Sequence, residues 1–171
     1  IIQVTNLYYK GITATRTQEA ARNIIEEISR GIQYSGGRIV TPVPGAISYF
    51  CIGSTRYSYV TDRKLVDTAP TSDDAYHVLV TDTNANCSTY LNIAPLALPA
   101  GSKELMTPDM RLISLTITNT PAGSSLYIIT VRVVSGKGAN LDSSHKQCDG
   151  GSNNQFCAAS ELRTTVQKRI Q

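Results

Sequence analysis

The sequence predicts an α+β fold, in which one long N-terminal helix packs on an antiparallel β-sheet. Two observations point to this class. Apolar residues recur with a helical period in the second half of residues 1–34, and from residue 38 they gather in short runs rich in Val, Ile and Tyr. A length of 171 residues with 17% charged residues fits one globular domain. We expect three parts within it: the helix at 1–35, the sheet region at 38–135 and a C-terminal region at 136–171.

The second half of the helical segment is amphipathic. When residues are spaced at about 100°, the charged side chains fall on one side and the apolar ones on the other. We expect the apolar side to hold the helix to its own sheet through Ala21, Ile24, Ile25, Ile28 and Ile32. Gly36 and Gly37 follow the last apolar position and predict a left-handed C-cap there.

The first half of the segment has no single apolar side. Its apolar residues spread around the circumference: Ile1, Ile2, Val4, Leu7, Tyr8, Tyr9 and Ile12. No N-cap residue precedes them, so we expect a helix that starts before Ile1. A helix that is apolar all round is normally buried on all sides. This half therefore needs a second apolar environment, either a membrane or neighbouring copies of the chain.

The rest of the chain reads as strands and turns. Apolar runs predict strands at 38–43, 47–52, 55–60, 76–81, 110–118 and 126–134, with a weaker candidate at 89–93. Gly53 and Ser54 predict a hairpin turn, and residues 119–125 connect the two longest strands as an antiparallel pair. The polar segment 62–75 predicts a surface loop. Ser160 as N-cap, with Leu162, Val166 and Ile170 at intervals of four, predicts a short terminal helix.

Four cysteines, Cys51, Cys87, Cys148 and Cys157, stand at wide spacings without a zinc-ligand pattern. An even number of such cysteines favours two disulfides in an oxidising compartment. Three pairings are possible. We favour Cys148–Cys157, which closes the shortest loop around a stretch of Gly, Ser and Asn, and this choice leaves Cys51–Cys87.

The sequence contains no strong catalytic or cofactor motif. It has neither GxSxG nor a glycine-rich phosphate loop, and SSHK at 143–146 fits SxxK only formally. Residues 82–86 begin like a calcium loop, but Cys87 and Ile93 replace its glycine and glutamate. For that segment, and for Asp142, Asp149 and residues 153–154, we favour turn formation over a metal site. We expect no enzyme activity, no cofactor and no metal.

Basic residues near the C-terminus are candidates for a surface that binds DNA. Arg163, Lys168 and Arg169, with Lys146, would form a patch for DNA or a surface if the fold gathers them. The net charge of +3 is small, and no aromatic residues alternate with these cations as single-strand stacking requires. We favour a solvated helix face.

The order of these parts resembles a type IV pilin or a type II secretion pseudopilin. That family combines a helix with a hydrophobic first half and an amphipathic second half, an antiparallel sheet on the second half, and a disulfide-bounded C-terminal region. AARNIIEEISRGIQYSGG resembles the amphipathic half, and ISYFCIGSTRYSYV, YHVLVT, MRLISLTIT and LYIITVRVV resemble the sheet. Cys148 to Cys157, followed by AASELRTTVQKRI, resembles the C-terminal region. The likeness covers nearly the whole chain as an architecture.

The resemblance implies a structural subunit, major or minor, of an extracellular filament used in adhesion, motility, DNA uptake or secretion. Its partners would be other pilin subunits, a host or bacterial surface, and, before assembly, the inner membrane through a hydrophobic helix ahead of Ile1. The filament contacts would then come from Ile1, Ile2, Val4, Leu7, Tyr8 and Ile12.

The alternative is a secreted module that binds carbohydrates or a host surface. Tyrosines would make its contacts, for example Tyr57, Tyr59 and Tyr90. A flat exposed tyrosine cluster would favour this alternative, whereas a protruding N-terminal helix would favour the filament subunit.

Overall fold

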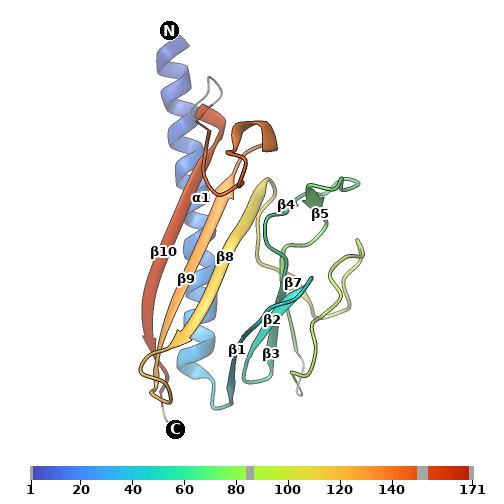
Figure 1. The fold of residues 1–171 in the computed structure, drawn as a ribbon, viewed down its shortest axis with the longest axis vertical. Helices are drawn as coiled ribbons and strands as arrows, with labels where there is room; N and C mark the ends of the chain where they lie inside the picture. The colour runs from blue at the N-terminus through green and yellow to red at the C-terminus, as the bar shows by residue number, and fades with distance from the viewer. Residues whose placement is uncertain (1, 84–86, 150–153, 170–171) are drawn as a thin grey trace.

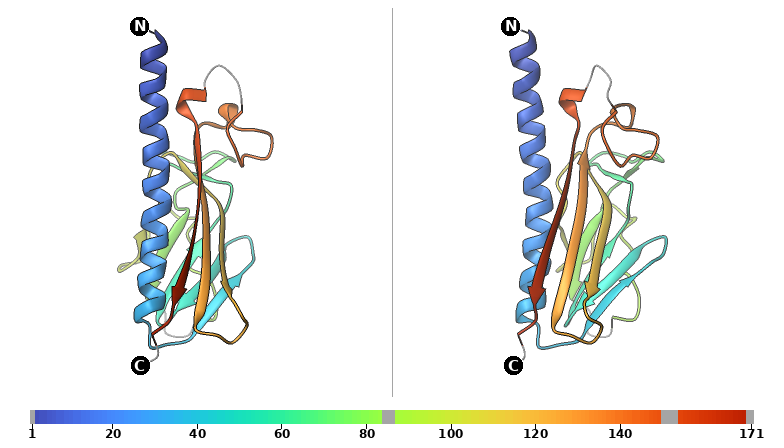
Figure 2. Two further views of the ribbon diagram at one scale, coloured as in Figure 1. Left: turned by 90° about the vertical axis from the view of Figure 1, so that its left-hand side faces the viewer. Right: turned by 60° about the vertical axis from the view of Figure 1, so that its left-hand side comes forward.

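The computed structural model describes residues 2–83, 87–149 and 154–169. One long helix, α1 (Ile2–Tyr34), runs along two five-stranded sheets (Figure 1). The N-terminal end of α1 extends beyond the sheets, and the later part lies against β9 and β10 (Figure 2). The α+β class is therefore confirmed.

The strands divide between two sheets. The first consists, in spatial order, of β1 (Ile39–Val43), β2 (Ser48–Ile52), β3 (Thr55–Tyr59), β6 (Leu79–Thr83) and β7 (Lys103–Glu104). The second consists of β10 (Ala158–Gln167), β9 (Leu126–Ser135), β8 (Met110–Asn119), β4 (Lys64–Leu65) and β5 (Asp74–Ala75). The single sheet expected from the sequence is thus wrong, because the hairpins β2–β3 and β8–β9 each recruit a different further strand, β6 and β10.

The main core lies between α1 and the two sheets. The sheets contribute mainly Val, Leu, Ile and aromatic residues, among them Phe50 and Tyr57, whose rings stack with centroids 4.5 Å apart. The helix contributes the residues expected from its apolar side: Ala21, Ile24, Ile25, Ile28 and Ile32, all buried. Their period of 3.6 matches the face that α1 turns toward β9 and β10.

The C-terminal segment is a strand, and the predicted terminal helix is wrong. Strand β10 pairs with the whole of β9 in continuous antiparallel register. Ser160, the predicted N-cap, is a buried residue within this strand. Leu162 and Val166 stand four apart, a spacing that fits one face of a helix and equally one face of a strand. Pairing with an equally long neighbour decides between the two, and Ile170 lies outside the described residues.

The end of α1 also differs from the prediction. Neither Gly36 nor Gly37 has a positive φ, so the expected left-handed C-cap is absent. The amide of Ser35 donates to the carbonyl of Gly31 at 2.9 Å, and the Ser35 hydroxyl accepts the amide of Gly37 at 3.1 Å. Glycine at position 37 has a packing reason instead, because a Cβ there would lie 2.7 Å from the Cα of Gly53.

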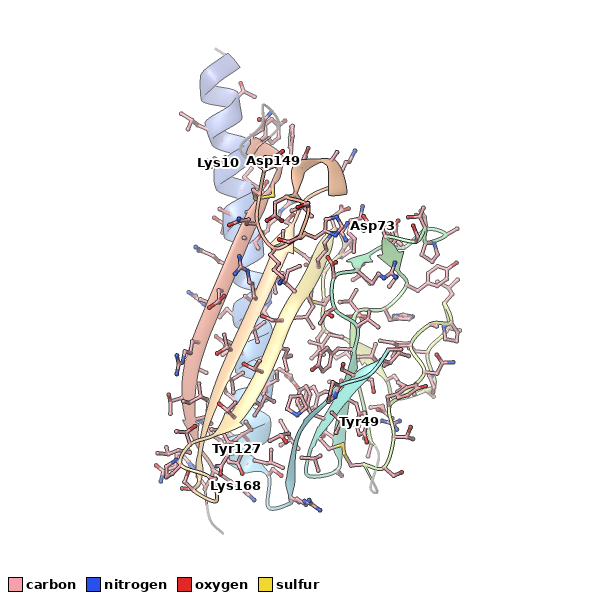
Figure 3. All side chains as sticks on the ribbon, viewed as in Figure 1. Lys10, Tyr49, Asp73, Tyr127, Asp149 and Lys168 are labelled. Atoms are coloured by element: carbon pink, nitrogen blue, oxygen red, sulfur yellow. A yellow bond between two sulfur atoms is a disulfide. The ribbon has the colours of Figure 1, made fainter. Side chains whose placement is uncertain are left out.

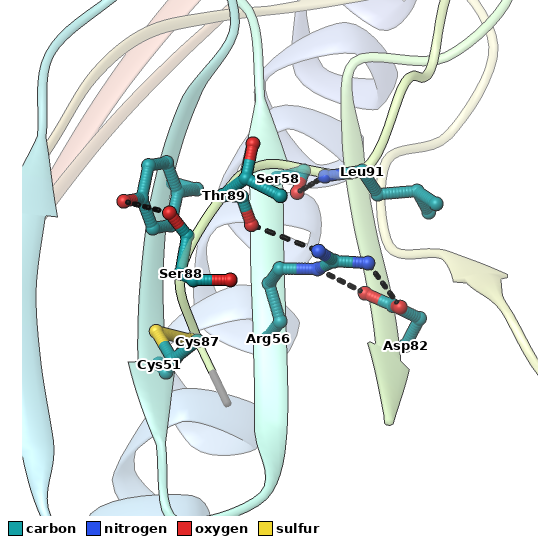
Figure 4. The surroundings of a disulfide bond; sticks show 9 residues. Cys51, Arg56, Ser58, Asp82, Cys87, Ser88, Thr89 and Leu91 are labelled. Carbon is teal, nitrogen blue, oxygen red and sulfur yellow. Dashed lines mark hydrogen bonds and ion pairs between the residues drawn. A yellow bond between two sulfur atoms is a disulfide. The ribbon is translucent and has the colours of Figure 1, made fainter. Parts of the chain in front are cut away.

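Two loop predictions need correction. The segment 62–75, expected as a surface loop, contains β4 and β5, and it buries Leu65. The segment 89–93, the weaker strand candidate, forms no strand. Side-chain bonds hold it against β3 instead, from Arg56 to the carbonyl of Thr89 and from the amide of Leu91 to Ser58 (Figure 4).

Candidate assembly surface

The first half of α1 exposes apolar side chains. Leu7 is 70% exposed and Tyr8 66%, while Ile12 is half-buried. Ile2 and Val4 belong to the helix, but their side chains and all of Ile1 lie outside the described part of the chain. Leu7 and Tyr8 thus belong to the N-terminal half of α1, whose end extends beyond the sheets (Figure 1).

A shallow groove of about 470 Å³ follows this exposed part. It is lined by Leu7, Tyr8, Gly11, Ile12, Thr15 and Arg16. Gly11 lies at its centre in sequence, and a Cβ there would meet nothing within 4 Å. Glycine in a helix interior costs roughly 1 kcal/mol relative to alanine. No contact within the described residues requires a glycine at this position. A residue without a side chain there would allow another molecule to approach the helix closely.

The turn of α1 from Tyr9 to Thr13, just before the packed half, contacts the C-terminal region. The ring of Tyr9 lies 5.7 Å from that of Phe156, which belongs to the short 3₁₀ helix Asn154–Phe156. The Thr13 hydroxyl donates to the carbonyl of Tyr9 at 2.9 Å, and that of Thr17 donates to the carbonyl of Thr13 at 2.8 Å. Thr17 is fully buried, so the boundary between the exposed and the packed half of α1 falls just before it.

Both predicted disulfides are present. Cys51 and Cys87 are joined with their Cα atoms 6.1 Å apart, and Cys148 and Cys157 with theirs 5.7 Å apart. The second bond covers a small separate core of Val134, Leu141 and Cys157. The first bond attaches the segment at Cys87 to β2, and the second attaches the loop at Cys148 to the residue just before β10, and each restricts the unfolded chain.

Two arginine–aspartate pairs support irregular segments as well, one beside Cys87 and one between β4 and β5, and local sequence patterns do not reveal them. Arg56 on β3 forms a bidentate ion pair with Asp82 on β6. Its Nε donates to Oδ1 at 2.9 Å and its Nη2 donates to Oδ2 at 2.6 Å (Figure 4). Arg111 on β8 is fully buried and binds both carboxylate oxygens of Asp73. Hydrogen bonds from the Arg111 guanidinium hold the pKa of Asp73 below its usual value.

The remaining candidate polar sites are engaged within the fold. The carboxylate of Asp82 is occupied by Arg56. Asp142 accepts bonds from the Ser144 hydroxyl and the Lys146 amide, which lower the pKa of its carboxyl. Nδ1 of His77 lies 3.5 Å from Oε2 of Glu104, and burial raises the pKa of the Glu104 carboxyl. Among the described residues no group of His, Cys, Asp and Glu has the arrangement of a metal site; Asn84, Asn86 and Asn153 lie outside them.

The fold does not gather the C-terminal basic residues into one patch. Lys168 donates to the carbonyl of Gly37, and Arg169 stacks over Tyr34 at 5.4 Å, both at the end of the molecule opposite Lys10 (Figure 3). Arg163 is exposed on the outer face of β10. Lys146 belongs to the loop after β9, and Asp149 of the same loop lies at the opposite end of the molecule from Lys168 in Figure 3.

The three tyrosines named for the alternative interpretation do not form an exposed cluster. Tyr57 is 2% exposed and Tyr59 5%, because both pack in the core beneath β2 and β3. Of the three tyrosines named for surface contacts, only Tyr90 is exposed, at 45%.

Comparison of the chain with models of known protein families, with curated proteins and with solved structures finds no match. Within the described residues, no helix combines the length and apolar character needed to cross a membrane.

Proposed function

We propose that this chain is a structural subunit of a bacterial type IV pilus or a related secretion filament, and that it assembles through α1. The observation that carries the proposal is the contrast along α1. Its second half is buried against its own sheets, whereas its first half presents Leu7, Tyr8 and Gly11 to solvent. In a filament, copies of this half would cover one another.

Burial energetics favour such an arrangement. Covering a large apolar side chain is worth about 1.5–3 kcal/mol, and Leu7 and Tyr8 gain little of this in a single copy. Exposed apolar residues that follow one another along a helix mark an interaction surface rather than scattered surface residues. The two disulfides agree with an oxidising, extracellular location for the head, the part of the molecule after Thr17.

The proposal also includes an apolar helical segment ahead of Ile1, which would anchor the subunit in the inner membrane before assembly. The codons upstream of Ile1 provide an independent test of this segment. A short basic leader, a small-residue cleavage site and about twenty apolar residues with one early glutamate would support it. An ordinary cleavable signal peptide followed by polar sequence would contradict it.

Substitution of Leu7 tests the assembly surface. Leu7→Glu places a charge in the exposed groove, which is lined by α1 residues alone. Leu7 is mostly exposed, so its replacement should not disturb the packing of the sheets. We expect a folded head, with an unchanged free energy of unfolding, and no filaments by electron microscopy of the producing cells. Ile12→Glu tests the next turn of the same surface.

Asn23→Glu is the matched control, because Asn23 is exposed on the half of α1 whose opposite side packs on the sheets. It introduces the same charge into the same helix outside the groove, and filaments should form. Normal filaments from the Leu7→Glu variant would overturn the proposal, as would equal loss of filaments in the control.

A further inference from the structure

Strand β10 leaves a long edge of the second sheet open. It is the last strand in that sheet and, among the described residues, pairs with β9 alone. Figure 2 (left) shows β10 along its length from the side of this edge, with α1 beside it and no described segment in front. A ten-residue strand with an uncovered row of backbone donors and acceptors is a template for pairing with another strand.

The register identifies which residues point their backbone groups outward. The amide of Lys168 donates to the carbonyl of Ser125, so this opposed pair is a hydrogen-bonded one. Hydrogen-bonded pairs alternate along an antiparallel ladder, and the β9–β10 register is continuous. The outward groups therefore belong to Ala159, Glu161, Arg163, Thr165 and Gln167. The side chains of these five residues are all exposed on the outer face.

The other sheet edges are protected in ways that β10 is not. Strand β1 contains Pro42 and an irregular register between Val40 and Val43. Strands β5 and β7 are two residues long. Prolines, bulges and short strands are among the usual devices against edge pairing, and β10 has none of these three. Its outward-facing residues do include charges, Glu161 and Arg163, which are opposite in sign.

We propose that the open edge of β10 pairs with β10 of a second copy of this chain, in antiparallel register about a two-fold axis at Leu162. In this register Glu161 faces Arg163 of the second copy, and Arg163 faces its Glu161. Ala159 faces Thr165, and on the inner face Ser160 faces Thr164. Shifting the axis to residue 161 would oppose two glutamates, and shifting it to residue 163 would oppose two arginines. Opposite charges directly across a strand pair stabilise it and like charges destabilise it.

The position of Arg132 strengthens this choice of register. Its guanidinium lies 3.4 Å from the Glu161 carboxylate across the β9–β10 pair. In the proposed dimer each Glu161 carboxylate would have Arg132 on one side and Arg163 of the second copy on the other. The charges would then alternate in sign across the joined sheets.

The helices also fit the arrangement. Helix α1 packs over both β9 and β10. With strands about 4.8 Å apart, a two-fold axis at the edge of β10 places the two α1 helices side by side at about 10 Å, the usual distance between packed helices. Their N-terminal ends would point in opposite directions. The contact therefore joins heads of opposed orientation, separate from the polar packing of a filament, and it does not depend on the proposed function.

A charge-swap series tests the register by sedimentation equilibrium of the 171-residue chain. In the dimer of Glu161→Arg, an arginine faces an arginine of the second copy at two places. In the dimer of Arg163→Glu, a glutamate faces a glutamate at the same two places. Each should weaken dimerisation by about tenfold or more. The double variant restores opposite charges and should dimerise within about threefold of the original chain. Because Glu161→Arg and the double variant both lose the Arg132 ion pair, recovery reports the contact between copies.

Asp67→Arg supplies the matched control, since it reverses a charge in the exposed loop between β4 and β5, away from β10, and should leave dimerisation unchanged. Thr165→Pro removes one outward N–H and should weaken the dimer, with the fold checked by circular dichroism. A chain that stays monomeric up to about 1 mM, in the millimolar range of weak association, overturns the proposal. A double variant as weak as the two single variants overturns the register.

Discussion

Between Thr17 and Ile32, α1 buries at least one residue in every turn against β9 and β10, whereas from Leu7 to Arg16 no residue is fully buried. Both halves are helical and both carry isoleucine and threonine. They differ in what covers their apolar residues. Helical structure alone therefore does not show which residues stabilise this fold, whereas burial by the sheets does.

The sharpest separation of the two halves comes from truncating one apolar residue in each. Ile28 is fully buried, so Ile28→Ala should lower the free energy of unfolding by about 2–5 kcal/mol. Leu7→Ala should change it by no more than about 0.5 kcal/mol, because Leu7 is mostly exposed in the single copy. Urea unfolding followed by circular dichroism measures both. Similar losses for the two variants would show that the protruding half also stabilises the head.

The buried half of α1 was predictable because its signal is local. Five apolar positions on one side of a helix determine a face, and the structure buries all five. The same holds for the hairpins β2–β3 and β8–β9, whose strands adjoin in sequence. The disulfide pairing that we favoured, from the short loop of Gly, Ser and Asn between Cys148 and Cys157, is also confirmed.

The features that the sequence did not predict depend on distant partners. Leu162 and Val166 fit a helix or a strand, and only β9, more than thirty residues earlier, decides for the strand. Arg111 lies in an apolar strand sequence, and its partner Asp73 lies in a segment that resembles a solvated loop. A buried charge gives no periodic signal, because what permits its burial is one oppositely charged group from elsewhere.

Two glycines in α1 give a smaller but cleaner comparison. A Cβ at Gly11 would meet nothing, whereas one at Gly31 would lie 3.2 Å from the Tyr57 hydroxyl oxygen and 3.4 Å from Cδ1 of Ile52. Gly11→Ala should therefore stabilise the local helix by about 0.5–1 kcal/mol and slow amide exchange between Leu7 and Thr15 severalfold. Gly31→Ala gains the same helix propensity but crowds two buried side chains, so it should not stabilise the protein. Equal stabilisation by both substitutions would contradict the difference between the halves.

Acid should weaken the half of α1 that depends on the sheets, through Asp73. Because Arg111 holds the folded pKa of Asp73 below the ordinary 3.8, the unfolded chain binds more protons near that pH. The contribution of Asp73 is thus complete above about pH 4 and is lost as pH falls through the lower folded pKa. The effect should be the smallest of the three, since the Asp73 side chain is 40% exposed and solvent screens it.

The variant Asp73→Asn should be less stable than the original chain at pH 7, and the difference in the free energy of unfolding should shrink as pH falls from 4 toward 2. Asp67→Asn is the control, because Asp67 has no arginine partner among the described residues and should show no such convergence. Urea unfolding at several pH values measures both variants. A difference for Asp73→Asn that stays constant down to pH 2 would mean that the ion pair with Arg111 does not stabilise the sheet on which α1 packs.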